Sequence, residues 1–398
     1  MRINSSDNTV SGFKAGAVAA GLKKGKELDL ALIFSEKESS AAGVFTRNLV
    51  RAAPVILSQE NIANGKARAI VANAGNANAC TGKDGLSHAR QTAELVAREL
   101  GIRPDEILVA STGVIGQPLN MDLIRNCIGS LVKGLSTGGI MQAAEAIMTT
   151  DSFPKISRFA GQAGGREYQI LGIAKGAGMI MPDMATMLCF ILSDISIEPD
   201  KLKEALLSSV DTTFNRITVD GDTSTNDMVL IMANGMAGNS VLSDADYSEF
   251  KYGLQHVMGE LALMIVRDGE GATKVIHINI HGAHSDSDAL NAARTVANSS
   301  LVKTAFYGQD ANWGRIMGAL GRAGIVMEEA KVDIWVDDVQ IVGAGLGLGG
   351  EAENKAAKRM ARKEFSLTVD IHQGPYKDGM ITCDLTHEYV TINADYRT

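Results

Sequence analysis

Strand-like and helix-like segments are mixed irregularly along the 398 residues, and this mixture most constrains how the chain can fold. Apolar and β-branched runs predict strands over 29–35, 68–72, 186–197, 273–281 and 388–393. Helical periodicity predicts helices over 84–100, 199–210, 285–302 and 351–365, the second with a proline at its start. These segments lack the regular βαβ spacing of about 30 residues that marks a doubly wound parallel sheet. The sequence therefore predicts a mixed α/β fold of another kind.

Composition excludes several classes of function. The net charge is −8 and only 5% of residues are aromatic, which disfavours a nucleic-acid platform. No apolar run approaches the ~20 residues of a membrane helix, and the N-terminus lacks the apolar stretch of a signal peptide. The four cysteines are scattered and form no CxxC pair, so their spacing supports neither a zinc site nor a disulfide framework. We expect a soluble cytoplasmic enzyme with no membrane or nucleic-acid partner.

Five loops are unusually rich in glycine and small polar residues. They cover 73–85, 111–116, 175–186, 220–227 and 267–274. Glycine permits positive φ and a close approach of the backbone, so any single loop is adequately explained as a turn. Together, however, they carry Thr, Lys, Asp and Glu, and they suggest a pocket that is partly lined by backbone amides.

Two familiar site types are weakly indicated. His277 and His281 share one face of the predicted strand, but no further ligand has a recognisable spacing, so a partly exposed strand face is the better interpretation and no metal is expected. Gly345, Gly347 and Gly350 match a dinucleotide-binding GxGxxG pattern. The preceding VDIWVDDVQIV is more typical of a hairpin than of a buried parallel strand, which favours a tight loop over a dinucleotide site.

The segment KGAGMIMPDMATMLCFIL, residues 175–192, contains a candidate nucleophile. A Gly-rich loop leads to Ala185, and Thr186 then begins an apolar run. The Thr186 hydroxyl could attack the Ala185 carbonyl, and hydrolysis of the resulting ester would leave Thr186 as a new N-terminus. Its free α-amine, with a pKa of roughly 7.7–8.0, would suit a general base beside the hydroxyl. By pattern alone, the better interpretation is that Thr186 is simply the first residue of a strand, where threonine is common.

The same segment closely resembles the self-processing segment of the ornithine acetyltransferases of arginine biosynthesis, also called glutamate N-acetyltransferases. Further matches span almost the whole chain. They are GFKAGAVAAGLKK near the start, NAGNANACTG, STGVIG, MTTDSFPK, RDGEGATK, LVKTAFYGQDANWGRI and the final NADYRT. Two small departures, Ala74 where Ser is common and Ala311 where Pro is common, affect no proposed catalytic role.

The resemblance implies a layered α/β fold of the type shared with self-processing aminopeptidases and similar to N-terminal-nucleophile hydrolases. It also implies cleavage between Ala185 and Thr186 into an alpha chain, 1–185, and a beta chain, 186–398. Two such units are expected to associate as a heterotetramer of two alpha and two beta chains.

The implied reaction is ping-pong acetyl transfer from N2-acetylornithine to glutamate through an acetyl-Thr186 ester, releasing ornithine and N-acetylglutamate. By resemblance, the Thr112 hydroxyl and the Gly113 backbone N–H stabilise the oxyanion. The substrate site is expected to include Thr149 (or Thr150), Lys175, Glu270, Asn393 and Thr398. Lys175 is the natural partner of a carboxylate and Glu270 of the ornithine ammonium, although each is also an ordinary loop residue. No cofactor is expected.

Alternatives remain at this stage. The first is a self-processing aminopeptidase or amidohydrolase of the same fold, which would pass its acyl group to water. The second is a dinucleotide-binding protein built around the GAGLGLGG segment. The sequence also leaves open whether acetyl-CoA serves as a second acetyl donor, how the oligomer is built, whether products regulate it, and how stable it is to heat.

Overall fold

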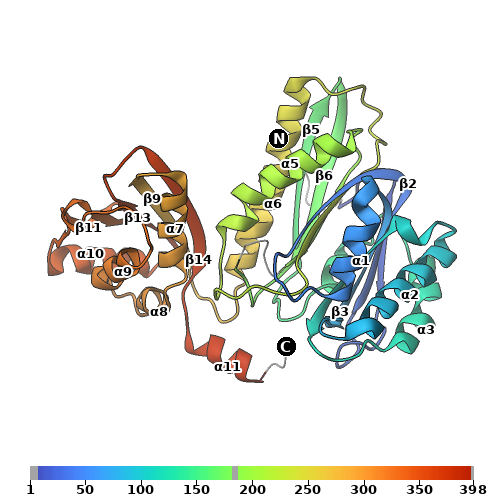
Figure 1. Ribbon diagram of the computed structural model, residues 1–398, viewed down its shortest axis with the longest axis horizontal. Helices are drawn as coiled ribbons and strands as arrows, with labels where there is room; N and C mark the ends of the chain where they lie inside the picture. The colour runs from blue at the N-terminus through green and yellow to red at the C-terminus, as the bar shows by residue number, and fades with distance from the viewer. Residues whose placement is uncertain (1–7, 182–186, 396–398) are drawn as a thin grey trace. The chain divides into compact units, whose positions relative to one another are not determined.

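The computed structural model describes residues 8–181 and 187–395, and these form two compact units (Figure 1). The first unit contains the residues up to Asn215 and the range Asp222–Ile265. The second contains Arg216–Gly221 and the residues from Val266 onward. Each unit has its own sheet.

The described part of the first unit is built on an eight-stranded sheet in the order β4-β3-β2-β8-β7-β6-β5, with β1 also paired to β2. The strands are β1 (Phe13–Val18), β2 (Leu30–Phe45), β3 (Lys66–Asn76), β4 (Ile107–Val114), β5 (Lys155–Ala163), β6 (Arg166–Lys175), β7 (Leu188–Ser193) and β8 (Met228–Ala233). The pairs β3–β4 and β7–β8 are parallel, and the others are antiparallel. The long β2 joins the two halves, because its first part pairs with β3 and its last six residues pair with β8.

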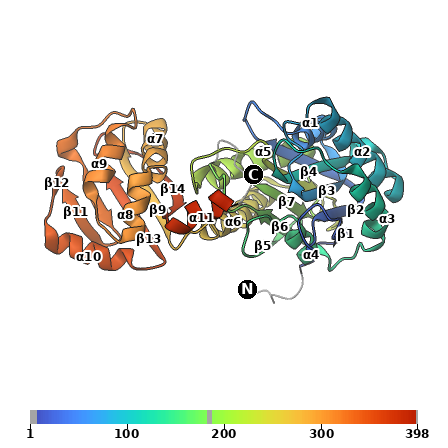
Figure 2. The ribbon, with the colours of Figure 1, turned by 90° about the horizontal axis from the view of Figure 1, so that it is seen from below.

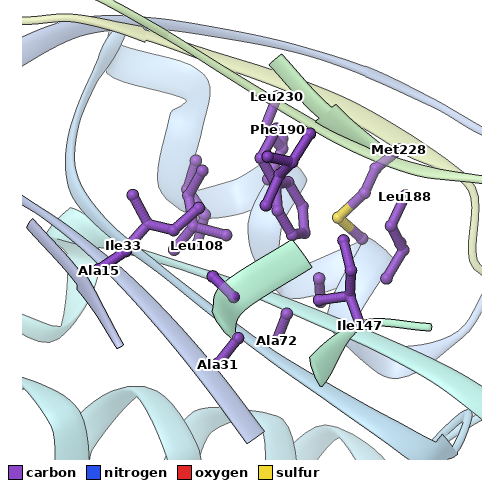
Figure 3. Close-up of a cluster of buried hydrophobic side chains, with 14 of the residues drawn as sticks. Ala15, Ala31, Ile33, Ala72, Leu108, Ile147, Leu188, Phe190, Met228 and Leu230 are labelled. Carbon is purple, nitrogen blue, oxygen red and sulfur yellow. The ribbon is translucent and has the colours of Figure 1, made fainter. Parts of the chain in front are cut away.

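The two halves of this sheet share one apolar core. Because successive side chains of a strand point to opposite faces, alternate residues of each strand enter it. Figure 3 shows this cluster, to which β2, β3 and β4 contribute Ala31, Ile33, Ala72 and Leu108, and β7 and β8 contribute Leu188, Phe190, Met228 and Leu230. The intervening residues of β2, β3 and β4 enter a second core, in which they pack against helices.

Helices cover the outer faces of the sheet. The helices α1 (Ala53–Asn61), α2 (Gly82–Leu100) and α3 (Met121–Lys133) lie beside β3 and β4, whereas α5 (Pro199–Thr212) and α6 (Asp244–Arg267) lie on the opposite side (Figures 1 and 2). The short α4 (Ile140–Ala146) packs into the shared core. Gly172 of β6 illustrates the close packing, since a Cβ there would lie 2.8 Å from Leu261 of α6. The layers are therefore helices, one half of the sheet, the other half of the sheet, and helices again. This is the layered α/β fold that the family resemblance implied.

The second unit has a six-stranded sheet in the order β12-β11-β10-β13-β9-β14. Its strands are β9 (Val275–Ala283), β10 (Asp333–Val336), β11 (Val339–Gly343), β12 (Leu346–Gly347), β13 (Glu364–Asp370) and β14 (Tyr376–Cys383). The helices α7 (Asp286–Ala297), α9 (Trp313–Gly321) and α10 (Gly350–Met360) contribute to one core with this sheet, as does α8 (Ser300–Gly308). On β9 the isoleucines enter this core, while His277 and His281 are partly or fully exposed on the other face, as expected.

The Gly-rich GAGLGLGG segment forms a hairpin turn. It joins β11 to β12, which are antiparallel, and β10 and β11 themselves form the hairpin predicted for VDIWVDDVQIV. Gly345 has a φ of +77° and lies against the backbone of Glu329 and Ala330, which explains the glycine. A dinucleotide fingerprint requires a parallel βαβ unit, and this segment has none.

Three secondary-structure predictions need correction. Residues 388–393 are not a strand, because α11 (His387–Asp395) is helical there. Its β-branched residues favour a strand, but no described strand pairs with the segment, and a helix satisfies its own backbone groups. The helix expected over 285–302 is interrupted after Ala297, where the Asn298 side chain accepts a hydrogen bond from Thr218. The helix expected over 351–365 ends at Met360, because Glu364 begins a strand paired with β9.

No helix in the described ranges is long and apolar enough to cross a membrane.

Candidate functional site

The carboxyl ends of β3 and β4 meet at one edge of the first sheet, because these strands are parallel. Thr112 and Gly113 lie at this edge, among the last residue pairs of the ladder that β4 makes with β3. Gly113 has a φ of +127°, and a Cβ there would lie 2.6 Å from the Asn76 backbone nitrogen. Both the conformation and the close approach therefore require glycine.

Lys175, the last residue of β6, reaches the same edge. Its Nζ donates to the Thr149 hydroxyl at 2.8 Å and, more weakly, to the Thr112 hydroxyl at 3.5 Å. Lys175 thus contacts both Thr112 and Thr149, and all three residues were predicted for the site from separate motifs. Of the two threonines in the MTTDSFPK motif, Thr149 is the one that contacts Lys175.

Asp151 lies next to Lys175, and its side chain is fully buried. Its Oδ1 accepts from Lys155 Nζ at 2.7 Å and from the Gly176 backbone N–H at 2.6 Å. Its Oδ2 accepts from the Thr149 backbone N–H at 3.0 Å and lies 3.8 Å from Lys175 Nζ. Burial opposes ionisation, but the ammonium groups of Lys175 and Lys155 outweigh it and lower the pKa of Asp151 to about 2.

A second buried carboxyl, Asp227, precedes β8. Its burial raises its pKa well above the ordinary value, although hydrogen bonds from Met187 and Ser224 and the charge of Lys175 act in the opposite direction. Among the described residues, its Oδ2 has no hydrogen-bond partner. The neighbouring Asn226 side chain donates to the carbonyls of Ala77 and Ser111, at 2.7 and 2.8 Å, and so fastens this segment to the ends of β3 and β4.

Two of the predicted residues come together in the second unit. Asn393 of α11 donates from Nδ2 to Glu270 Oε2 at 2.7 Å. The loop that carries Glu270 is held by Asp384, which accepts from the backbone N–H groups of Thr273 and Lys274 at 2.8 and 3.0 Å. Glu270 itself is largely buried.

Ala185, Thr186 and Thr398 lie outside the described residues. The neighbour of Thr186 in the chain is described, however. The Met187 backbone N–H donates to the Asp227 carboxyl. The Met187 carbonyl accepts from the Met228 backbone N–H at 3.1 Å. The residue that follows the predicted nucleophile is therefore hydrogen-bonded on both its donor and its acceptor.

Sequence reasoning missed Asp151, Lys155, Asn226 and Asp227. Asp151 and Lys155 are four residues apart in the MTTDSFPK motif, and Asn226 and Asp227 end the DGDTSTND loop. The sequence motifs therefore contain all four residues but indicate no role for them. Within the described ranges, no group of three or more His, Cys, Asp or Glu side chains could hold a metal ion.

The Thr112 hydroxyl, the Gly113 backbone and the Lys175 ammonium group thus lie at one edge of the sheet. Fixed donors of this kind stabilise developing oxyanions, and such sites are typical of enzymes that transfer acyl groups.

Comparison with known proteins agrees with that class. A model of the "ArgJ family" matches residues 14–398. The chain is 52% identical over 391 residues to a Geobacter sulfurreducens protein named arginine biosynthesis bifunctional protein ArgJ, covering 98% of this chain and 100% of that one. It is 46% identical over 398 residues to a Methanocaldococcus jannaschii protein named glutamate N-acetyltransferase, with 97% of each covered. The chain belongs to the ArgJ family.

A solved structure agrees as well. The crystal structure of arginine biosynthesis bifunctional protein argJ from Bacillus halodurans is 41% identical, with a TM-score of 0.50. The match covers 52% of this chain and 98% of the crystallised one, so the crystallised polypeptide is about half as long.

Proposed function

We propose that this protein is a glutamate N-acetyltransferase, which moves an acetyl group from N2-acetylornithine to glutamate and releases ornithine and N-acetylglutamate. The contact of Lys175 with Thr112 and Thr149, beside a position that only glycine can occupy, carries the proposal. Membership of the ArgJ family and the names of its relatives support it.

The proposed nucleophile is Thr186. Its Oγ attacks the acetyl carbon, the bond from that carbon to the ornithine nitrogen breaks, and ornithine leaves with a proton on its amine. The α-amine of Thr186 takes the hydroxyl proton in the first step and supplies the proton to the leaving amine. Glutamate then attacks the acetyl ester through its own amine, and the Thr186 hydroxyl is restored.

The described residues have roles on either side of this chemistry. The Thr112 hydroxyl accepts from Lys175, which leaves its own hydrogen available to a developing oxyanion, and the Gly113 N–H is the second donor. Lys175 and Thr149 hold the α-carboxylate that both amino acids share. We assign Glu270, with Asn393 and Thr398, to the remaining part of the substrate site, where a carboxylate would bind the ornithine ammonium.

We further propose cleavage between Ala185 and Thr186, giving chains 1–185 and 186–398. The strands before and after this position, β6 and β7, are antiparallel neighbours in register from Lys175 opposite Leu188. Both products would therefore stay hydrogen-bonded in one sheet after the cut. A crystallised relative of about half this length is consistent with such processing.

Intact mass tests the cleavage directly. Under denaturing conditions, we expect two chains with Thr186 at the N-terminus of the second, and under native conditions a heterotetramer of two alpha and two beta chains. Thr186→Ala should leave one uncut and inactive chain, while Thr186→Ser should still process because it keeps a hydroxyl. A single intact chain with full activity would refute the proposed nucleophile.

A coupled assay tests the reaction. Beyond a first burst of one equivalent per active site, ornithine should be released from acetylornithine in proportion to N-acetylglutamate formed, and only when glutamate is present. Sustained release without glutamate would instead indicate the hydrolase of the same fold. Relatives named bifunctional also suggest a second activity, so acetyl-CoA with glutamate should be tried as a donor pair. We expect the enzyme to need no cofactor and to act in the cytoplasm.

A further inference from the structure

Asp151 connects the two segments that carry Thr149 and Lys175, and it also contacts Lys155. It accepts from the Thr149 backbone just ahead of it, from Lys155 at the start of β5, and from the Gly176 backbone just after β6. Its side chain is 0% exposed. A carboxylate with this many donors is held in one orientation, and in turn it holds the segments that provide them.

The two lysines around Asp151 are not equivalent. Lys155 Nζ makes the direct hydrogen bond at 2.7 Å, whereas Lys175 Nζ lies 3.8 Å away and donates to the threonine hydroxyls instead. The Lys155 side chain is 0% exposed and that of Lys175 is 8% exposed. Of these two lysine side chains, only that of Lys175 therefore retains exposed surface.

These contacts indicate a division of roles. If Lys155 were absent, Lys175 would be the nearest cation to the buried carboxylate of Asp151. A buried charge without a counter-charge is costly, so the carboxylate would attract the Lys175 ammonium. Lys175 would then turn from the threonines toward Asp151, and its ammonium would be lost to a substrate.

We propose that Lys155 is the counter-charge of Asp151 and that it keeps the Lys175 ammonium available for the α-carboxylate of an amino acid. The assignment rests on the proposed function, because it takes Lys175 as the carboxylate-binding group.

A charge-balanced pair of variants tests it. Binding of ornithine to the processed enzyme is measured by calorimetry, and KM and kcat are measured for acetylornithine. Lys155→Met should weaken ornithine binding by roughly tenfold or more and raise KM, with kcat little changed. Lys155→Met combined with Asp151→Asn removes both charges and should return the dissociation constant to within roughly threefold of the wild type.

The matched control is Lys66→Met, which removes a lysine from the exposed ion pair with Glu38 in the same unit and should change neither binding nor kinetics. If Lys155→Met fails to fold, the double variant decides alone. A folded double variant that binds ornithine as poorly as Lys155→Met, or more than tenfold worse than the wild type, would overturn the proposal. Wild-type enzyme that binds ornithine but transfers no acetyl group would refute the proposed function and leave this binding test intact.

Discussion

Replacing Thr112 by valine tests the oxyanion assignment most sharply. Valine keeps the branched shape but removes the hydroxyl, and the structure indicates that little else is lost. Within the described ranges, the hydroxyl accepts a long, 3.5 Å hydrogen bond from Lys175, whose shorter bond to Thr149 remains. Removal of one oxyanion donor typically lowers kcat by about 100–1,000-fold, or about 2.7–4 kcal/mol of transition-state stabilisation.

The assay separates this effect from substrate binding. An interaction made only in the transition state lowers kcat and kcat/KM together, so KM for acetylornithine should change little. A single-turnover mass measurement should also show slow formation of the acetyl ester, because that step passes through the same oxyanion. Thr149→Val is the matched control: it removes the hydroxyl at 2.8 Å from Lys175 and should mainly raise KM. If Thr112→Val raised KM and left kcat intact, the oxyanion role would be wrong.

Three further predictions concern stability. Gly113→Ala should lower the melting temperature and the free energy of unfolding by about 1–3 kcal/mol or more, because alanine must adopt a φ of +127° against the neighbouring backbone. The control is Gly129→Ala on α3, where a Cβ meets nothing within 4 Å, and it should be neutral or stabilising. Equal effects of the two substitutions would refute the steric argument. Asp227→Asn should gain stability over the wild type as pH rises above 3.8 toward the raised folded pKa, because only the unfolded Asp227 ionises freely in that window. Asp151→Asn should show the opposite sign in urea unfolding, with a loss of stability at neutral pH that disappears as pH falls from 3.8 to about 2. A pH-independent difference for either variant would contradict the assigned burial or pairing.

Local pattern predicted several of the regular elements. Period-2 alternation placed β9 with its isoleucines buried and its histidines outward, and Pro199 marked the start of α5. The DD pair between two strand-like runs predicted the β10–β11 hairpin. These features depend on neighbouring residues, so a window of sequence contains the information.

The failures occurred where a distant segment decides the conformation. Residues 388–393 have strand-like side chains, yet α11 is helical because no described strand is available to pair with them. Glu364 leaves the helical pattern because β9, about ninety residues earlier, offers a parallel ladder. Propensity is weak, and pairing overrides it.

The site shows the same division. The sequence by itself determined the family, through motifs that lie in order along the chain, and it indicated Thr112, Thr149 and Lys175 as separate members of the site. Only the tertiary structure decided that Lys175 touches both threonines, that Asp151 and Lys155 support it, and that Asp227 is buried. Hydrogen bonds and burial depend on distances between segments that the sheet brings together, and spacing along a chain does not specify those distances.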